Sequence, residues 1–227
     1  MTQEENKLQI IEDGLVGFFD ILGFKAILQA NGVEESIDIV NTCMFEATVF
    51  AEKTFKSRFE VRSLIFSDSI LVALPNSKDS AGVLVFTCFC QQLFSGLLVH
   101  GLPARGAISR GRFAIQTQSD QIVFVGQPIV ESHELAASLE IAACALTPSS
   151  ESSVLSVPTR NIFQTHKTPL KNLPSRELNL LKFGTEFSCA EITQYFQAHK
   201  KKIDICSTKK LNNTIEFLKA CKELRPD

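Results

Sequence analysis

Two aspartates interrupt apolar, strand-like segments of this sequence, and they are its best candidates for chemistry. Asp20 lies within the run Gly17–Phe24, and Asp68 lies within Leu64–Leu71. A carboxylate among core residues carries a large desolvation cost unless a cation or several hydrogen-bond donors neutralise it. Neither run has Lys or Arg at a neighbouring position on the same strand face. A divalent metal ion shared by both aspartates would remove this cost, whereas each Asp taken alone is also typical of a helix cap or a hairpin turn.

Composition limits what the protein can do. Its 227 residues suffice for one main domain with a C-terminal extension. With 23 basic and 25 acidic side chains the net charge is −2, which gives no field that would attract nucleic acid or an anionic membrane. No apolar run reaches the roughly 18 residues of a membrane span, and the acidic first five residues are unlike a signal peptide. We therefore expect a cytoplasmic protein that neither binds nucleic acid nor inserts into a membrane.

Apolar periodicity and turn residues predict an alternation of strands and helices. In chain order, the predicted elements are a strand at 14–21, a turn at Gly23 into a helix whose later part is 34–53, extended segments at 59–67 and 69–74 hinged at Asp68, a helix at 79–99 capped by Asp79, a strand at 103–111, a polar loop at 112–120, a strand at 121–125 and a helix from about 129 to 143. The order βαββαβ matches a ferredoxin-like α+β core, with an antiparallel sheet and helices on one face. We assign residues 1–146 to this core.

The remaining residues, 147–227, are predicted to form an α/β extension that packs on the core or on a dimer interface. Residues 147–168 are rich in Ser, Thr and Pro, which is typical of a connector. A strand at 181–187 and helices at 190–199 and 211–224 are predicted to follow it. The basic cluster at 200–202 is typical of a solvated helix end.

A ferredoxin-like sheet brings the end of its first strand next to the tip of the following hairpin, so Asp20 and Asp68 should lie side by side. Two adjacent carboxylates can hold two divalent ions, which activate a hydroxyl and neutralise a triphosphate during in-line displacement. Oxygen ligands suit Mg²⁺ or Mn²⁺, and the four histidines are too scattered for a histidine-based site. The turn at 21–24, where Gly23 permits close approach and helix amides begin, would receive the phosphates.

Four segments resemble the motifs of class III nucleotidyl cyclases. Phe18–Phe24 resembles the family's segment around the first metal aspartate, and Phe66–Ser69 resembles the hairpin tip that carries the second. Arg105–Gly111 resembles the strand that follows, and Gly126 matches the glycine before the last helix of the catalytic core. The resemblance covers about residues 14–143. The spelling of these motifs is most similar to the stand-alone Pycsar uridylate and cytidylate cyclases of bacterial antiphage defence.

The resemblance implies a metal-dependent enzyme that converts UTP, or CTP as the second choice, into its 3′,5′-cyclic monophosphate and pyrophosphate. It implies a homodimer with composite active sites and a separate effector protein activated by the cyclic nucleotide. Asp20, Asp68 and the Ile21 carbonyl would ligate two Mn²⁺ or Mg²⁺ ions. The residues expected to contact the nucleotide are Phe19, Leu22, Gly23, Phe24, Leu64 and Arg105.

The sequence departs from the purine cyclases at the positions that read the base. These positions are Leu64 and Val123, and neither side chain can hydrogen-bond a purine edge. The family's transition-state Asn and Arg are replaced by Val130 and Glu134. Either other cations stabilise the phosphates, or the domain is a catalytically silent nucleotide-binding module. A structural dimerisation domain is a third reading.

Arg105 is the first candidate for the cation that would stabilise the phosphates, and Arg110 and Arg112 are the next candidates. A structural alternative stays open for Arg105, in which it pairs with Glu131 or Glu140. ATP or GTP as the substrate also stays open.

Overall fold

The computed structural model describes residues 7–56, 60–75, 79–118, 121–157, 160–199 and 205–223. The strands are β1 (Lys7–Ile21), β2 (Arg62–Phe66), β3 (Ser69–Leu74), β4 (Ala104–Gln118), β5 (Gln121–Gly126), β6 (Cys144–Leu146), β7 (Phe163–Leu170) and β8 (Leu173–Leu181). The helices are α1 (Phe24–Phe55), α2 (Ser80–Val99), α3 (Gln127–Ser138), α4 (Pro148–Leu155), α5 (Cys189–Gln197) and α6 (Ile205–Cys221), with a 3₁₀ turn at Arg160–Ile162.

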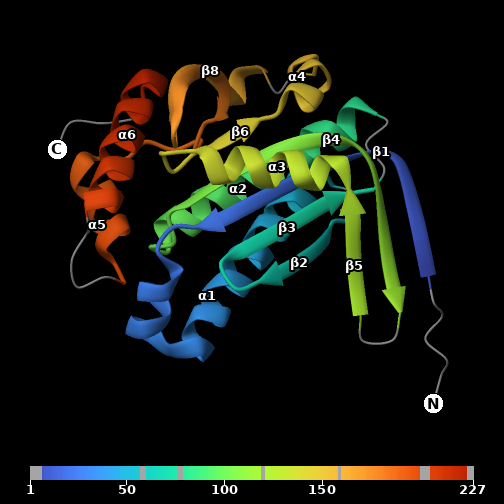
Figure 1. The fold of residues 1–227 in the computed structure, drawn as a ribbon, viewed down its shortest axis with the longest axis horizontal. Coiled ribbons are helices and arrows are strands. Elements are labelled where there is room, and N and C mark those ends of the chain that lie inside the picture. The colour runs from blue at the N-terminus through green and yellow to red at the C-terminus, as the bar shows by residue number, and fades with distance from the viewer. Residues whose placement is uncertain are drawn as a thin grey trace.

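These strands form one sheet with the order β2-β3-β1-β4-β6-β8-β7, and β5 pairs with β4 outside this path (Figure 1). The predicted α+β class and the βαββαβ order are confirmed. The sheet is antiparallel except where β6 runs parallel to β4. β1 and β4 are therefore the central strands, and they join the β2–β3 hairpin on one side to the C-terminal strands on the other.

Helices cover both faces of the sheet, which corrects the prediction of a one-sided arrangement. Successive residues of β1 alternate between the faces. Phe19 is fully buried in a larger core that includes residues of α1 and α2, whereas Phe18 packs edge-on against His133 of α3 at a ring-centroid distance of 5.1 Å. Figure 1 shows α3 in front of the sheet and α2 behind it. The prediction missed the second layer because the ferredoxin-like pattern places only the first two helices.

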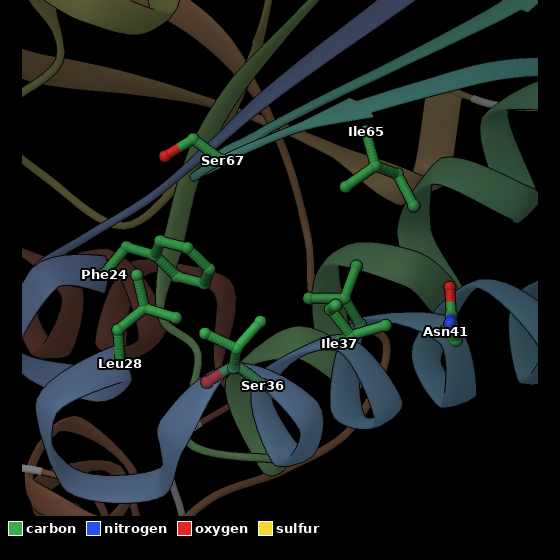
Figure 2. A pocket seen from close by; sticks show the side chains of 9 residues that line it. Phe24, Leu28, Ser36, Ile37, Asn41, Ile65 and Ser67 are labelled. Carbon is green, nitrogen blue, oxygen red and sulfur yellow. The ribbon is translucent and has the colours of Figure 1, made fainter.

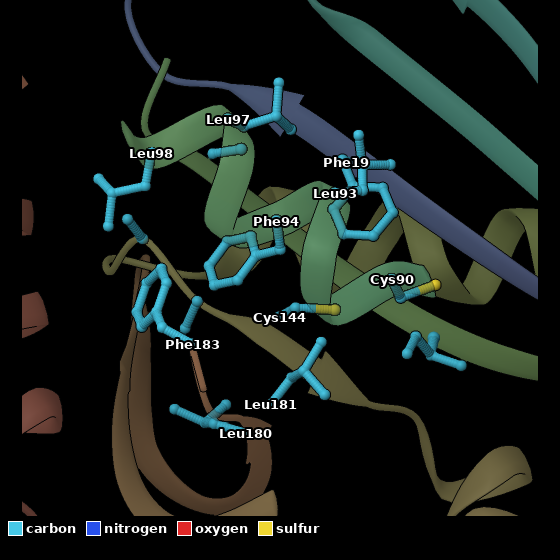
Figure 3. Close-up of a cluster of buried hydrophobic side chains, with 14 of the residues drawn as sticks. Phe19, Cys90, Leu93, Phe94, Leu97, Leu98, Cys144, Leu180, Leu181 and Phe183 are labelled. Carbon is cyan, nitrogen blue, oxygen red and sulfur yellow. The ribbon is translucent and has the colours of Figure 1, made fainter. Parts of the chain in front are cut away.

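The helix α2 supplies the centre of the larger core. Its first turn is capped as predicted, because Asp79 accepts a hydrogen bond of 2.6 Å from the amide of Gly82. By length and composition α2 is also apolar enough to cross a membrane, although 67% of that stretch is buried inside the fold. Such burial is typical of a core helix, and Figure 3 shows Leu93 and Phe94 of α2 packed among residues of the sheet.

Residues 112–118 form a strand, not the polar loop that their composition predicts. This part of β4 pairs with residues 7–11 of β1 on one side and with β5 on the other. A strand that is half exposed on a projecting ribbon needs few apolar residues, which explains its polar sequence. Strand pairing also makes α3 shorter than the predicted helix, which ran to about residue 143. The helix ends at Ser138, and residues 144–146 form β6, which pairs with β4.

The chain beyond residue 146 continues both the sheet and the core. The predicted connector contains α4 and β7, and β8 occupies 173–181 where the expected strand was 181–187. β8 pairs with β6, and the buried residues Phe163, Leu180 and Phe217 belong to the same larger core as Phe94. Residues from both sides of position 146 therefore share one hydrophobic core.

Candidate active site

Asp20 and Asp68 lie at the same end of neighbouring strands. Asp20 is the penultimate residue of β1 and pairs in register with Ser69, the first residue of β3. Asp68 occupies the turn between β2 and β3, and its carbonyl accepts a 2.8 Å hydrogen bond from the amide of Ile21. Ser67 before it has a positive φ of 55°, which lets the chain reverse in two residues. The ladder therefore fixes the two aspartates next to each other.

Arg105 faces Asp20 from the adjacent strand. The two residues are register partners in the β1–β4 ladder, and Nε of Arg105 donates to Oδ2 of Asp20 at 2.7 Å. Nη1 of Arg105 donates to the carbonyls of Ala137 at 2.7 Å and Leu139 at 3.3 Å, at the end of α3. Both charged side chains are about one-fifth exposed, at 18% and 20%. A cross-strand cation thus offsets the desolvation of Asp20, which inspection of each run alone did not reveal.

The two alternative partners of Arg105 are engaged elsewhere. Glu131 accepts hydrogen bonds from Ser109 and Ser149. Glu140 lies 3.2 Å from Nζ of Lys209, and so its carboxylate faces α6. The structural alternative for Arg105 is therefore corrected, because its carboxylate partner is Asp20 itself.

Arg110 and Arg112, the other two candidate cations, form ion pairs with acidic residues of β1 that lie several residues before Asp20. Arg110 makes two hydrogen bonds of 2.7 Å to the carboxylate of Asp13, and these raise the pKa of its guanidinium. Arg112 pairs with Glu12 at 3.1 Å on the exposed surface. Both pairs tie β1 to β4, and neither arginine lies at the strand end that carries Asp20.

The donor atoms at this strand end fit an oxygen-ligated divalent ion. Two carboxylates and the backbone carbonyl of Ile21 are hard ligands of the kind that Mg²⁺ and Mn²⁺ prefer, with water and substrate phosphates completing the shell. The bond from Arg105 uses Oδ2 of Asp20. No group of three or more His, Cys, Asp or Glu residues that could hold a metal occurs in the described parts of the chain, so protein ligands at this strand end would be the two carboxylates and the carbonyl.

The turn after Asp20 offers backbone amides to an anion. Gly23 adopts the left-handed conformation, with φ 74° and ψ 28°, and it precedes α1 without any side-chain cap. An uncapped helix start leaves amide hydrogens that attract phosphate. Gly23 is exposed and Phe24 is half-buried.

Two other residues expected to touch the nucleotide lie inside the protein. The side chain of Phe19 is fully buried in the larger core, on the opposite face from Asp20. Leu22 is also buried, and its amide donates to the carbonyl of Pro103 at 2.8 Å. The side chains of Phe19 and Leu22 therefore hold the turn in place, so that only their backbone atoms are available to a nucleotide, and the surface that faces solvent is formed by Gly23 and Phe24.

The presumed base-reading positions are widely separated within one chain. Leu64 packs against a second, smaller core on the α3 face, which includes Val16 and Leu71. Val123 is 42% exposed on β5. Val123 pairs with Gln116, which lies eleven residues along β4 from Arg105, or roughly 35 Å of extended strand. One chain therefore cannot bring Val123 to Asp20, and a site containing both would need two copies.

The fold has known counterparts, although the sequence does not: no protein-family model and no curated protein matches it. A dimeric guanylyl cyclase domain of the RhoGC fusion protein from the aquatic fungus Blastocladiella emersonii superposes with a TM-score of 0.58 at 14% identity, covering 78% of this chain and 98% of that one. The fold is that of a class III nucleotidyl cyclase catalytic domain. The adenylyl cyclase CyaB from P. aeruginosa matches with a TM-score of 0.53 at 12% identity, covering 78% and 96%.

The cyclase likeness extends beyond the sequence motifs. Residues 1–146 make up 64% of the chain (146/227), whereas both matches cover 78%. Part of the C-terminal region must therefore belong to the shared fold, in agreement with the continuous sheet. The sequence motifs missed this part because none of the four lies beyond Gly126.

Proposed function

We propose that the protein is a metal-dependent pyrimidine nucleotide cyclase that converts UTP into 3′,5′-cyclic UMP and pyrophosphate. The observation that carries this proposal is the juxtaposition of Asp20 and Asp68 at one strand end, beside the uncapped start of α1. The cyclase fold supports the reaction class. In the reaction, a bond forms between O3′ and the α-phosphorus, the bond to the β-phosphate oxygen breaks, and the hydroxyl proton passes to water.

Each residue of the site has a distinct task in this proposal. Asp20, Asp68 and the Ile21 carbonyl would hold two Mn²⁺ or Mg²⁺ ions, which supply a lowered pKa for the 3′-hydroxyl and neutralise the leaving pyrophosphate. The amides at Gly23 and Phe24 bind the polyphosphate at the helix start. Arg105 exchanges its bond with Asp20 for a bond to a phosphate oxygen, which keeps its charge compensated throughout.

A pyrimidine substrate is proposed because Leu64 and Val123 present no group that could bond a purine edge. The choice of UTP first and CTP second rests on the resemblance of the motifs alone. The separation of Val123 from Asp20 supports a homodimer with composite sites. We further propose a cytoplasmic role in antiphage defence, in which the cyclic nucleotide activates a separate effector. This part rests on the resemblance of the motifs to the Pycsar cyclases.

A second candidate function is a silent nucleotide-binding module of the same fold. Two observations favour it. The carboxylate of Asp20 is already neutralised by Arg105, and Val130 and Glu134 replace the transition-state Asn and Arg of the purine cyclases. Such a module would bind a triphosphate with Mn²⁺ and release it unchanged.

The test is to incubate the purified protein with Mn²⁺ and each of the four nucleoside triphosphates and to separate the products by chromatography. We expect cyclic UMP and pyrophosphate from UTP, and neither product from the Asp20→Ala and Asp68→Ala variants. The matched control is Asp38→Ala, which removes an exposed carboxylate of α1 outside the site. Cyclic CMP as the main product would reassign the substrate. Unchanged triphosphates in all four reactions, with nucleotide still bound, would establish the silent module.

A further inference from the structure

A pocket of about 460 Å³ lies between α1 and the β2–β3 hairpin. Figure 2 shows Phe24, Leu28 and Ile37 of α1 together with Ile65 of the hairpin around it. Apolar side chains make up most of its wall, and Ser67 lies at its hairpin side. No charged residue lines it. This composition and volume are those of pockets that hold small molecules.

The pocket exists because α1 is broken at Gly32. This residue has φ 80° and ψ −178°, a conformation that essentially only glycine adopts. The break is held by the hydroxyl of Ser36, which donates to the Gly32 carbonyl at 2.7 Å. Phe24 and Leu28 precede the break, whereas Ile37 follows it, so the two parts of α1 form two walls. A straight helix would not enclose this space.

The pocket lies on the opposite side of the hairpin from the candidate active site. Leu64 packs into the smaller core on the α3 face, and its neighbour Ile65 therefore points to the α1 face, where the pocket is. Asp20 points to the α3 face, because it bonds to Arg105, whose guanidinium also donates to the Ala137 carbonyl at the end of α3. The pocket and the candidate active site therefore adjoin at Phe24 and at the turn of Ser67 and Asp68.

We propose that this pocket binds a small uncharged molecule with an aromatic or aliphatic ring body and one hydrogen-bonding group. Its walls would desolvate a charge without compensation, which excludes nucleotides and other ions. The ring body contacts Phe24, Ile37 and Ile65. The hydrogen-bonding group faces one of the polar lining residues, Asn41 or Ser67. This inference does not rest on the cyclase reaction, although Phe24 and Ser67 belong both to the pocket and to the two turns of the candidate active site.

Occupancy of the pocket bears on the active site through one residue. Ser67 lines the pocket and directly precedes Asp68 in the turn. A ligand wedged between α1 and Ile65 therefore restrains the turn that carries the second carboxylate. We expect slower deuterium uptake by the amides of 66–70 when the pocket is filled.

The test uses 4-phenylphenol as the probe and biphenyl-4-sulfonate, which has the same ring body with a charge, as its comparison. Binding is measured by isothermal titration calorimetry to the full chain. We expect saturable binding of 4-phenylphenol, with a dissociation constant below about 1 mM, and at least about tenfold weaker binding of the sulfonate. Equal affinity for the two compounds, or no saturable binding of 4-phenylphenol, would overturn the proposal.

Two variants of α1 locate the binding. Ile37→Glu places a charge in the pocket wall, at a residue that is 53% exposed, and should weaken 4-phenylphenol binding by about tenfold or more. Phe45→Glu changes an exposed apolar residue of the same helix outside the pocket and should leave binding unchanged. Equal effects of the two variants contradict the assignment. Loss of a dimer in Ile37→Glu without any probe binding would also overturn it, because a second copy would then fill the pocket.

Discussion

Three ion pairs join β1 to β4, and the difference between the pairs of Arg110 and Arg105 separates the site from its scaffold. Arg110 donates two hydrogen bonds to Asp13, one to each carboxylate oxygen. Arg105 donates to Asp20 only from Nε, and its Nη1 donates to the backbone carbonyls of Ala137 and Leu139 at the end of α3. In a bidentate pair the arginine occupies both carboxylate oxygens. Arg105 bonds to Oδ2 of Asp20 alone, so the carboxylate of Asp20 remains able to bind a metal ion.

The surroundings of the two pairs differ in the same sense. Asp20 lies beside Asp68, so this strand end carries two carboxylates, and Arg105 bonds to the one on Asp20. Asp13 lies near the register shift in β1, and its side chain is 45% exposed. Two carboxylates against one arginine leave a net negative charge for a divalent ion to neutralise. The comparison thus predicts that catalytic activity depends on the Arg105–Asp20 pair, whereas the stability of the fold depends on this pair and on Arg110–Asp13.

The largest expected effect is on catalysis by the aspartates. Asp20→Ala should lower cyclase activity by roughly 10³-fold or more, because metal ligation contributes several kcal/mol of charge stabilisation in the transition state. Asp13→Ala removes an equivalent carboxylate from the same strand and should change activity by less than about threefold once stability is matched. The measurement is pyrophosphate release under saturating Mn²⁺ and UTP. Similar losses in the two variants would mean that Asp20 acts only through the fold.

The arginines should show a smaller contrast. Arg105→Ala is expected to reduce kcat by roughly 10²-fold, because a cation at the phosphates is lost, and to destabilise the fold by about 2–3 kcal/mol, because a partly buried charge loses its partner. Arg110→Ala should reduce stability by a similar amount or less and leave kcat nearly unchanged. Denaturant unfolding and steady-state kinetics separate the two effects. A purely structural Arg105 would show the stability loss with kcat intact.

The smallest expected effect concerns Glu223, a buried carboxylate that accepts hydrogen bonds from backbone amides. It accepts hydrogen bonds from the amides of Phe183 at 3.1 Å and Gly184 at 2.9 Å, yet burial is the larger influence and raises its pKa. The folded pKa exceeds the unfolded value of about 4.3, so the free energy of unfolding should fall as pH rises from the unfolded to the folded pKa. Glu223→Gln should lack this decline. A steeper decline in the variant would contradict the sign.

Much of the site was predictable from sequence because it depends on local order along the chain. Asp20 at a strand end and Asp68 in a hairpin tip follow from apolar runs and turn residues. The partner of Asp20 was not predictable in the same way, since it depends on the β1–β4 register, which no single segment encodes. Arg105 was singled out for phosphate, but its contact with Asp20 appears only when strands 85 residues apart are aligned.

Other features have simpler physical causes. Strand alternation next to Asp20 places the side chain of Phe19 on the opposite face, so a contact of Phe19 with the nucleotide would have to come from its backbone. Residues 112–118 were expected to be a loop because a ribbon with one exposed face carries polar residues. The break at Gly32, and with it the pocket behind the hairpin, had no signal beyond a lone glycine inside a helical pattern.

The central claim is that Asp20 and Asp68 together form a metal site for a nucleoside triphosphate. The most direct measurement is a Mn²⁺ titration monitored by electron paramagnetic resonance, in the presence of a non-hydrolysable UTP analogue, with wild type and the isosteric variants Asp20→Asn, Asp68→Asn and Asp13→Asn. We predict protein-bound Mn²⁺ in wild type and Asp13→Asn, and at least about tenfold weaker binding in the other two variants. Equal Mn²⁺ binding by all four proteins would contradict the account.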